Sequence, residues 1–170
     1  CYLNEAGGMA ALAGVIPRPL PGERGVLTPA QIEAVLRPPN LHFAPTRLLC
    51  LENTHNAAGG TVMSPHQTTA LCATAHAHGL RVHLDGARIF NAAVALGTEV
   101  RLLVRDADSV MFCISKGLSA PVGSLLCGSA EFVARARRAR KVLGGGMRQA
   151  GVLAAAGIVA LETMVDRLAE

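Results

Sequence analysis

The sequence predicts an α/β fold in which a mostly parallel sheet is flanked by helices. Apolar runs of strand length alternate with helical segments of ordinary length, which is typical of βαβ units. The apolar residues are mainly Ala, Val and Leu, with 3% aromatic residues and no Trp, a composition that suits helices stacked on a parallel sheet. The 170 residues fit about one domain, since domains average roughly 100–200 residues.

The first part of the chain predicts two helices separated by a loop. Residues 2–14 are rich in Gly and Ala and predict a closely packed helix, and residues 17–25 contain three prolines and predict turns. Thr28 is a typical N-cap, Pro29 suits the first helical position, and Gln31 completes a capping box. We expect this second helix to end at Pro38.

The rest of the chain predicts strands and helices in alternation. The strands are the short apolar runs at 48–51, 80–84, 109–114 and 123–127. The helices are expected over 64–78, with a second capping box at its start, from about 88 to 97, over 130–143 and over 149–168.

Polar residues follow three of these predicted strands. Residues 52–55, Asp85 and Lys116 each lie where a strand ends. Ligands of open α/β sheets bind at the carboxyl ends of the strands, so these residues point to one site.

Lys116 has two interpretations. It can cap the end of a strand with its ammonium group in water. Alternatively, a partly desolvated lysine with a lowered pKa is a nucleophile toward carbonyls, as in a Schiff base with pyridoxal phosphate.

Asp85 and Arg88 add the other groups that pyridoxal phosphate needs. A carboxylate beside the pyridine nitrogen keeps the ring protonated, so that the ring can accept electrons from a carbanion. An arginine is a good bidentate donor to a carboxylate. A local ion pair between Asp85 and Arg88 at the start of a helix explains the same spacing.

Four longer motifs resemble the low-specificity L-threonine aldolases. They cover essentially the whole chain in the family's order. They are LENTHN, HLDGARIFNA, SKGLSAPVGS and GGGMRQAG, which lie at residues 51–56, 83–92, 115–124 and 144–151.

This resemblance implies the large domain of a fold-type-I pyridoxal-phosphate enzyme. Family members split β-hydroxy-α-amino acids by retro-aldol cleavage, which converts L-threonine or L-allo-threonine to glycine and acetaldehyde. Lys116 matches the lysine that holds the cofactor, and Asp85 matches the partner of the pyridine nitrogen. Arg88 is then expected to contact the substrate carboxylate or the cofactor.

The resemblance also assigns roles outside the strand ends. His42 matches a histidine near the substrate hydroxyl, where it would assist loss of the proton; a loop histidine without a role is the alternative. Lys141 and Arg148 match basic residues that reach toward the cofactor site of a neighbouring subunit, which implies a homo-oligomer, a dimer or tetramer. A plain surface helix is the alternative explanation for Lys141.

Other binding chemistries are not expected. His55 is expected chiefly to shape its loop, and no metal site is expected from the scattered histidines or from the five widely spaced cysteines. The basic run at 135–141 has no interleaved aromatic residues, so we expect no nucleic-acid binding. No apolar stretch reaches the roughly 20 residues that span a bilayer, and no signal peptide is recognisable. We therefore expect a cytoplasmic protein without membrane contacts.

The chain is also expected to be a central part of a longer protein. On the resemblance, residues 1–170 form a partial cofactor-binding domain, and the N-terminal segment and the C-terminal small domain lie outside them. The isolated 170 residues are then expected to be inactive and poorly stable, because surfaces meant for the other parts are exposed. Two further functions remain open, another reaction on the same fold (β-elimination or transamination) and an inactive fragment.

Overall fold

A four-stranded sheet forms the centre of the computed structural model, which describes residues 4–170. The strand order is β1-β2-β3-β4, and the first three strands are parallel while β4 runs antiparallel to β3. Both the α/β fold and the mostly parallel sheet predicted from the sequence are confirmed. The strands are β1 (Leu48–Glu52), β2 (Arg81–Asp85), β3 (Ser109–Cys113) and β4 (Ser124–Gly128).

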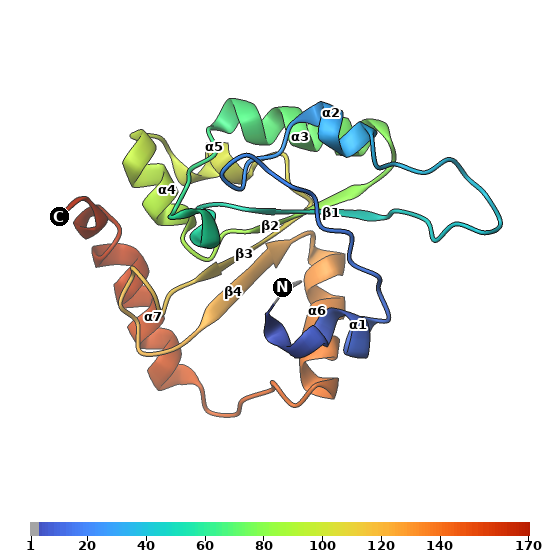
Figure 1. Cartoon of the computed structure of the whole chain (residues 1–170). Helices are drawn as coiled ribbons and strands as arrows, with labels where there is room; N and C mark the ends of the chain where they lie inside the picture. The colour runs from blue at the N-terminus through green and yellow to red at the C-terminus, as the bar shows by residue number, and fades with distance from the viewer. Residues whose placement is uncertain (1–3) are drawn as a thin grey trace.

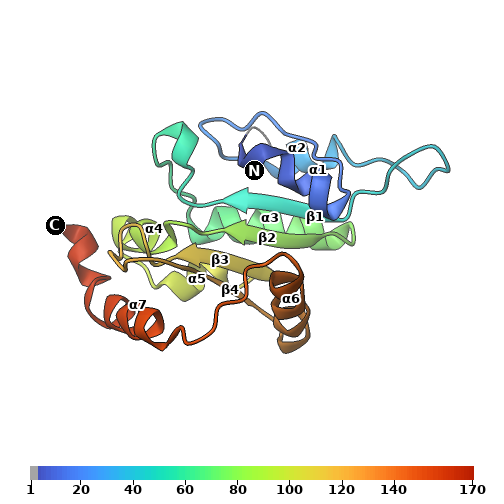
Figure 2. The same ribbon diagram turned by 90° about the horizontal axis from the view of Figure 1, so that it is seen from below.

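Helices flank the sheet, with α2, α3 and α5 on one side and α6 and α1 on the other (Figures 1 and 2). The α-helices are α1 (Gly8–Ala13), α2 (Pro29–Glu33), α3 (Pro65–Ala77), α4 (Ile89–Leu96), α5 (Val100–Val104), α6 (Ala130–Val142) and α7 (Gly151–Thr163). Three single turns of 3₁₀ helix complete the elements: η1 (Glu5–Gly7), η2 (Asn56–Ala58) and η3 (Asp166–Ala169).

Both predicted capping boxes are present. Thr28 and Gln31 exchange hydrogen bonds at the start of α2, and Ser64 and Gln67 do so at the start of α3. Each pair satisfies backbone N–H groups that have no partner inside the first turn. The starts of α2 and α3 were therefore predicted correctly from the sequence.

Helix ends were placed less well. Helix α2 ends at Glu33, well before Pro38, because the next backbone bonds switch to the tighter i to i−3 pattern. Helix α7 begins at Gly151 rather than residue 149, where Gln149 has a φ of 48°, and it ends at Thr163 rather than 168. Helix α5 was not predicted.

One face of the sheet is packed into the core. Val82 and Leu84 of β2 are fully buried, and Leu49 and Leu51 of β1 are nearly so. They pack against the apolar side of α3, which includes Leu71. Burial of each such side chain contributes about 1.5–3 kcal/mol before the loss of conformational entropy is counted.

The opposite face of the sheet is more open. Cys50 and Cys127, which lie in apolar runs predicted to be strands, are both exposed. In β1 the side chains alternate between the two faces, and Cys50 lies on the face opposite the packed core. Every residue of β4 is exposed, including Leu125 and Leu126.

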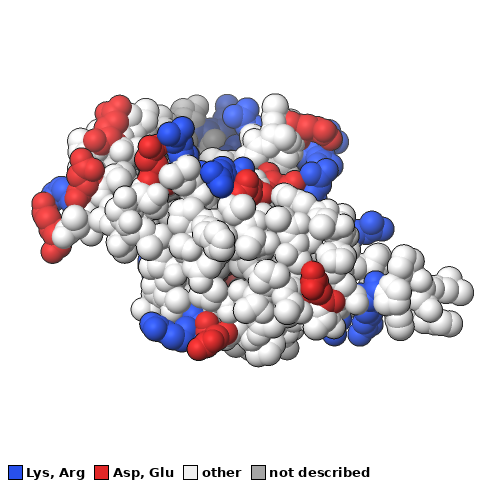
Figure 3. All heavy atoms as spheres, turned by 90° about the horizontal axis from the view of Figure 1, so that it is seen from above, with Lys and Arg blue, Asp and Glu red and all other residues white. Residues whose placement is uncertain are grey.

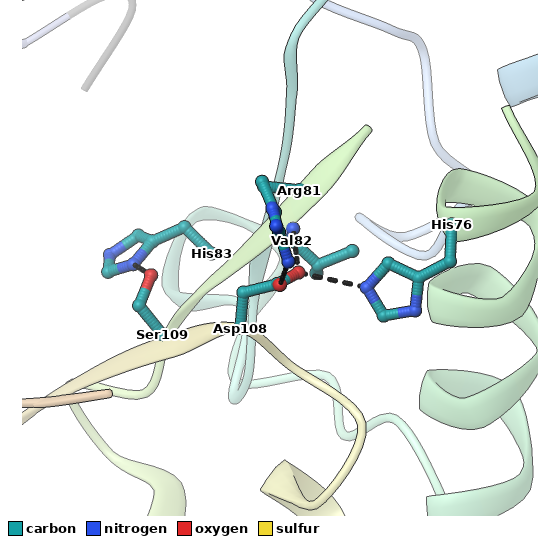
Figure 4. Close-up of polar contacts among 6 residues, drawn as sticks. All are labelled: His76, Arg81, Val82, His83, Asp108 and Ser109. Atoms are coloured by element: carbon teal, nitrogen blue, oxygen red, sulfur yellow. Dashed lines mark hydrogen bonds and ion pairs between the residues drawn. The ribbon is translucent and has the colours of Figure 1, made fainter. Parts of the chain in front are cut away.

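A polar cluster around Asp108 joins α3 to the beginning of β2 (Figure 4). The Asp108 carboxylate lies 2.8 Å from His76 Nε2 and accepts hydrogen bonds from Arg81 Nη1 at 2.6 Å and from the Val82 backbone N–H at 2.8 Å. Partial burial by itself raises the pKa of Asp108, but the hydrogen bonds from His76, Val82 and Arg81 outweigh it and lower the pKa to about 2.

Charged side chains are sparse over the α2–α3 side of the molecule. Helix α3 contains no Lys, Arg, Asp or Glu. In the view from above, the middle of this side is uncharged, and acidic and basic groups are mixed around its rim (Figure 3). No continuous basic patch is visible on this side.

Candidate active site

The carboxyl ends of the parallel strands bring Asp85 to the edge of the sheet. Asp85 pairs in register with Glu52 of β1 and with Met111 of β3. The Asn53 N–H donates to the Asp85 carbonyl at 2.9 Å, and the Gly86 N–H donates to the Met111 carbonyl at 2.8 Å. Hydrogen bonds to both neighbouring strands therefore fix the backbone that carries Asp85.

The Asp85 side chain is exposed and oriented. Its Oδ1 accepts a hydrogen bond from the Ala87 N–H at 3.0 Å, two residues along the chain. A Cβ on Gly86 would lie 2.9 Å from the Met111 carbonyl oxygen, so only glycine fits between Asp85 and Ala87. The turn thus holds a carboxylate at the strand end and leaves it accessible to a ligand.

Arg88 does not pair with Asp85. Among residues 4–170, the ion pairs do not include one between these two side chains, so the local ion pair allowed by the spacing is absent. Arg88 is half-buried and occupies the N-cap position of α4 without a capping hydrogen bond from its side chain. Its guanidinium group is consequently available to a ligand.

Lys116 lies in a tight loop after β3. The Ser119 N–H donates to the Lys116 carbonyl at 2.9 Å, and the Ala120 N–H donates to the Ile114 carbonyl at 2.9 Å. Buried Ile114 and Leu118 anchor the loop on either side, while Lys116 itself is exposed in this chain. Within residues 4–170 the Lys116 amine is therefore not desolvated as the sequence led us to expect. Its loop extends past Cys113 and Ser124, the last paired residues of β3 and β4.

Gly117 connects the lysine loop to α4. A Cβ on Gly117 would lie 3.0 Å from Asn91 Oδ1 and 2.9 Å from a methyl carbon of Leu168. The backbone next to Lys116 is therefore packed against the helix that begins beside Arg88. Asp85, Arg88 and Lys116 are brought to the same edge of the sheet.

An open hollow of about 580 Å³ lies beside this edge. Its size falls within the range of about 300–1,000 Å³ that is usual for small-molecule sites. It is lined by Arg88, the N-cap of α4, by Asn91 of α4, and by Thr54, Gly60, Val62, Val94, Ala95, Leu168 and Ala169. Asp85 and Lys116 are not among its lining residues. Asn91 was not singled out from the sequence, although its spacing of three residues from Arg88 on a helix could have indicated it.

The loop after β1 is held together by Asn53 and His55. The buried Asn53 side chain donates to the Met63 carbonyl at 3.0 Å and accepts from the Met63 N–H at 3.1 Å. His55 Nδ1 accepts from the Ala58 N–H at 3.2 Å, and its ring lies directly against Gly25, which has a φ of 81°. These contacts agree with the expected role of His55 in shaping the loop.

His42 lies at the other end of the sheet. It is exposed in the long loop that precedes β1, and this loop projects away from the strand ends that carry Asp85 and the Lys116 loop (Figure 1). Its backbone N–H donates to Asn40 Oδ1 at 2.9 Å. The structure of one chain does not bring His42 and Lys116 together.

Lys141 and Arg148 are also exposed and remote from Asp85. Lys141 is in the last turn of α6, and Arg148 lies in the connection between α6 and α7 (Figure 1). Within residues 4–170, no group of three or more His, Cys, Asp or Glu side chains could hold a metal ion. In the same part of the chain, no helix is long and apolar enough to cross a membrane.

The sequence matches the model of the beta-eliminating lyase family over residues 1–170. The chain belongs to this family. Similar proteins include the low-specificity L-threonine aldolase 1 of Arabidopsis thaliana, which is 46% identical over 99% of the chain. The low specificity L-threonine aldolase of Escherichia coli strain K12 is also 46% identical over 99% of the chain.

The chain spans about half the length of these beta-eliminating lyase relatives, namely 48% and 50%. Among solved structures, a putative L-allo-threonine aldolase from Listeria monocytogenes superposes with a TM-score of 0.85 at 21% identity, covering 98% of this chain and 45% of that one. That likeness shows the fold. The resemblance to threonine aldolases stated from the four motifs is confirmed.

Proposed function

We propose that the full-length protein is a pyridoxal-phosphate-dependent aldolase that cleaves L-threonine or L-allo-threonine to glycine and acetaldehyde. The observation that carries this proposal is that Asp85 ends β2 and Lys116 follows the end of the neighbouring parallel strand β3, while Arg88 follows Asp85 by three residues at the start of α4. The names of the relatives support the same reaction.

The residues at the strand ends fit the cofactor. Asp85 presents an oriented, accessible carboxylate, and Lys116 presents an accessible amine on a loop anchored by two buried residues. When bound, pyridoxal phosphate supplies an electron sink for the negative charge that develops at the α-carbon as the carbon–carbon bond breaks. Asp85 would hold the proton on the pyridine nitrogen, and Lys116 would hold the aldehyde carbon.

Arg88 would bind the substrate carboxylate. A guanidinium group offers paired N–H donors in a plane that matches a carboxylate, and Arg88 lines the hollow next to the lysine loop. This contact would fix the amino acid by its α-carboxylate and leave its hydroxyl-bearing carbon free to depart.

The roles of His42, Lys141 and Arg148 stay predictions. Because His42 projects from the opposite end of the sheet, a role at the substrate hydroxyl requires this loop to reach the site of a neighbouring copy. The exposed positions of Lys141 and Arg148 are compatible with such a homo-oligomer. We also propose the cytoplasm as the location.

A β-elimination is the second candidate reaction, and the family description favours it. The same lysine, aspartate and arginine would serve it. The two reactions differ in their products, because elimination releases ammonia and a 2-oxo acid instead of glycine and an aldehyde. Product analysis with threonine and with serine therefore separates them.

Replacement of Lys116 tests the proposed function. The full-length protein should show visible absorbance from the bound cofactor and release acetaldehyde from threonine, and Lys116→Ala should abolish both. Arg18→Ala, on an exposed loop far along the chain, serves as the control and should change neither signal. Wild-type absorbance retained in Lys116→Ala would remove this lysine from its proposed role.

The isolated chain provides a separate test. Residues 1–170 mixed with pyridoxal phosphate should show no turnover of threonine, since much of the apolar surface of β4 is open and the lysine is not enclosed. Turnover at the rate of the full-length protein would contradict this expectation.

A further inference from the structure

Asn91 is a polar side chain of α4 that packs beside Gly117 in the loop after β3. Its carboxamide takes part in none of the side-chain hydrogen bonds found within residues 4–170, although it is half-buried. Asn53 shows the contrast, since both ends of its carboxamide are bonded to the Met63 backbone. In the described part of the chain no buried side-chain N or O atom lacks a partner, so the Asn91 amide is open to the hollow that it lines, and its donors and acceptor are free for a bound molecule.

The surroundings of Asn91 define what it would meet. Asn91 is in the first turn of α4 and Arg88 is the N-cap residue of that helix, and both line the same hollow of about 580 Å³. Its carboxamide also faces Gly117, directly after Lys116, since a Cβ on Gly117 would lie 3.0 Å from Asn91 Oδ1. Asn91 thus shares the hollow with Arg88, which would hold an anion, and lies next to the loop that carries Lys116.

We propose that the Asn91 side-chain amide donates a second hydrogen bond to the α-carboxylate of the amino-acid substrate that Arg88 binds, which makes Asn91 a substrate-binding residue. This inference rests on the proposed function for the presence of an amino acid in the hollow. A guanidinium group together with a neutral amide can satisfy both oxygens of one carboxylate, whereas a second cation at this position would repel Arg88.

Two variants of the full-length, cofactor-loaded protein test the proposal. Asn91→Leu keeps approximately the volume that packs against Gly117 but removes the amide, and Asn91→Asp keeps the shape but places a negative charge near the carboxylate. We expect the KM for L-threonine to rise about tenfold in Asn91→Leu, as for loss of one hydrogen bond to a charged group, with a smaller change in kcat. The rise should be larger in Asn91→Asp because like charges repel.

Binding measurements keep the test independent of turnover. The dissociation constant for glycine, measured by calorimetry, should rise by a factor similar to that of KM, while the affinity for pyridoxal phosphate, measured from its absorbance, should not change. A variant that loses cofactor affinity but binds glycine normally would show that the anion is the cofactor phosphate and overturn the proposal. Wild-type KM and glycine affinity in Asn91→Leu would show that Asn91 only spaces the Lys116 loop, which also overturns it.

Failure of the proposed function gives a different pattern. If the wild type binds glycine without cleaving threonine, the aldolase proposal fails, and the glycine affinities of the two variants still decide the role of Asn91. If the wild type binds no amino acid, both proposals fail. Should Asn91→Leu not fold, Asn91→Asp, which is nearly identical in shape, provides the same comparison.

Discussion

The Asp108 carboxylate should contribute substantially to the free energy of unfolding, because it links α3 to β2. This carboxylate connects the end of α3 to the beginning of β2 through His76, Arg81 and the Val82 N–H, and 22% of the Asp108 side chain is exposed. The pKa is lowered from 3.8 to about 2. At 1.36 kcal/mol per unit, this difference corresponds to about 2 kcal/mol of stabilisation in the ionised form.

The direction of the pH dependence follows from the lowered pKa. A carboxyl group whose folded pKa lies below its unfolded value stabilises the fold above the unfolded pKa, and this contribution is lost as the pH falls through the folded pKa. For Asp108, the contribution is complete above about pH 4 and disappears between about pH 4 and pH 2.

Asp108→Asn tests this magnitude in the full-length protein. We expect the free energy of unfolding at pH 7, from urea titration followed by circular dichroism, to fall by about 2 kcal/mol. The difference from the wild type should narrow as the pH is lowered below 4. Glu99→Gln is the control, because Glu99 also pairs with an arginine, Arg101, but both side chains are largely exposed and such pairs contribute about 0–1 kcal/mol. Equal effects of the two substitutions, or a pH-independent difference for Asp108→Asn, would refute the reasoning.

Two further predictions concern glycines beside the site. Gly86→Ala should destabilise the protein by about 1–3 kcal/mol and weaken cofactor binding, because the new methyl group would lie 2.9 Å from the Met111 carbonyl oxygen. Thermal unfolding measures the loss of stability, and cofactor absorbance measures the loss of binding. An unchanged melting temperature would contradict the predicted clash. Gly25→Ala should destabilise more than Gly59→Ala: both residues have a φ of 81°, but only Gly25 lies against the His55 ring, so equal losses of stability would show that this contact is unimportant.

The local part of the fold was predictable because it depends on short-range chemistry. The capping boxes at Thr28 and Ser64 fix helix starts through bonds within four residues of the chain, and the apolar runs fix the strands. The end of α2 was predicted too late, because no residue between Glu33 and Pro38 marks the change to the tighter turn. Helix α5 was not predicted because it has only 5 residues and no capping hydrogen bond from a side chain. It packs against α3 and α4.

The site also contains residues that the sequence identified and one that only the structure revealed. Asp85, Arg88 and Lys116 were identified from the sequence because their residue types, spacing and positions at strand ends match one cofactor chemistry. The proposed role of Asn91 required the structure, because Asn91 and Gly117 are far apart in the sequence and come together only in the fold.

By itself, the sequence determined the family, the order of strands and helices and the identity of the residues at the strand ends. Tertiary structure decided the register that aligns Asp85 with Met111, the alternation that leaves Cys50 exposed, and the separation of His42 from Lys116. The physical reason is the distance along the chain over which each kind of interaction acts. Propensity, capping and side-chain chemistry act over a few residues, whereas register, burial and the meeting of distant loops depend on how the whole sheet packs.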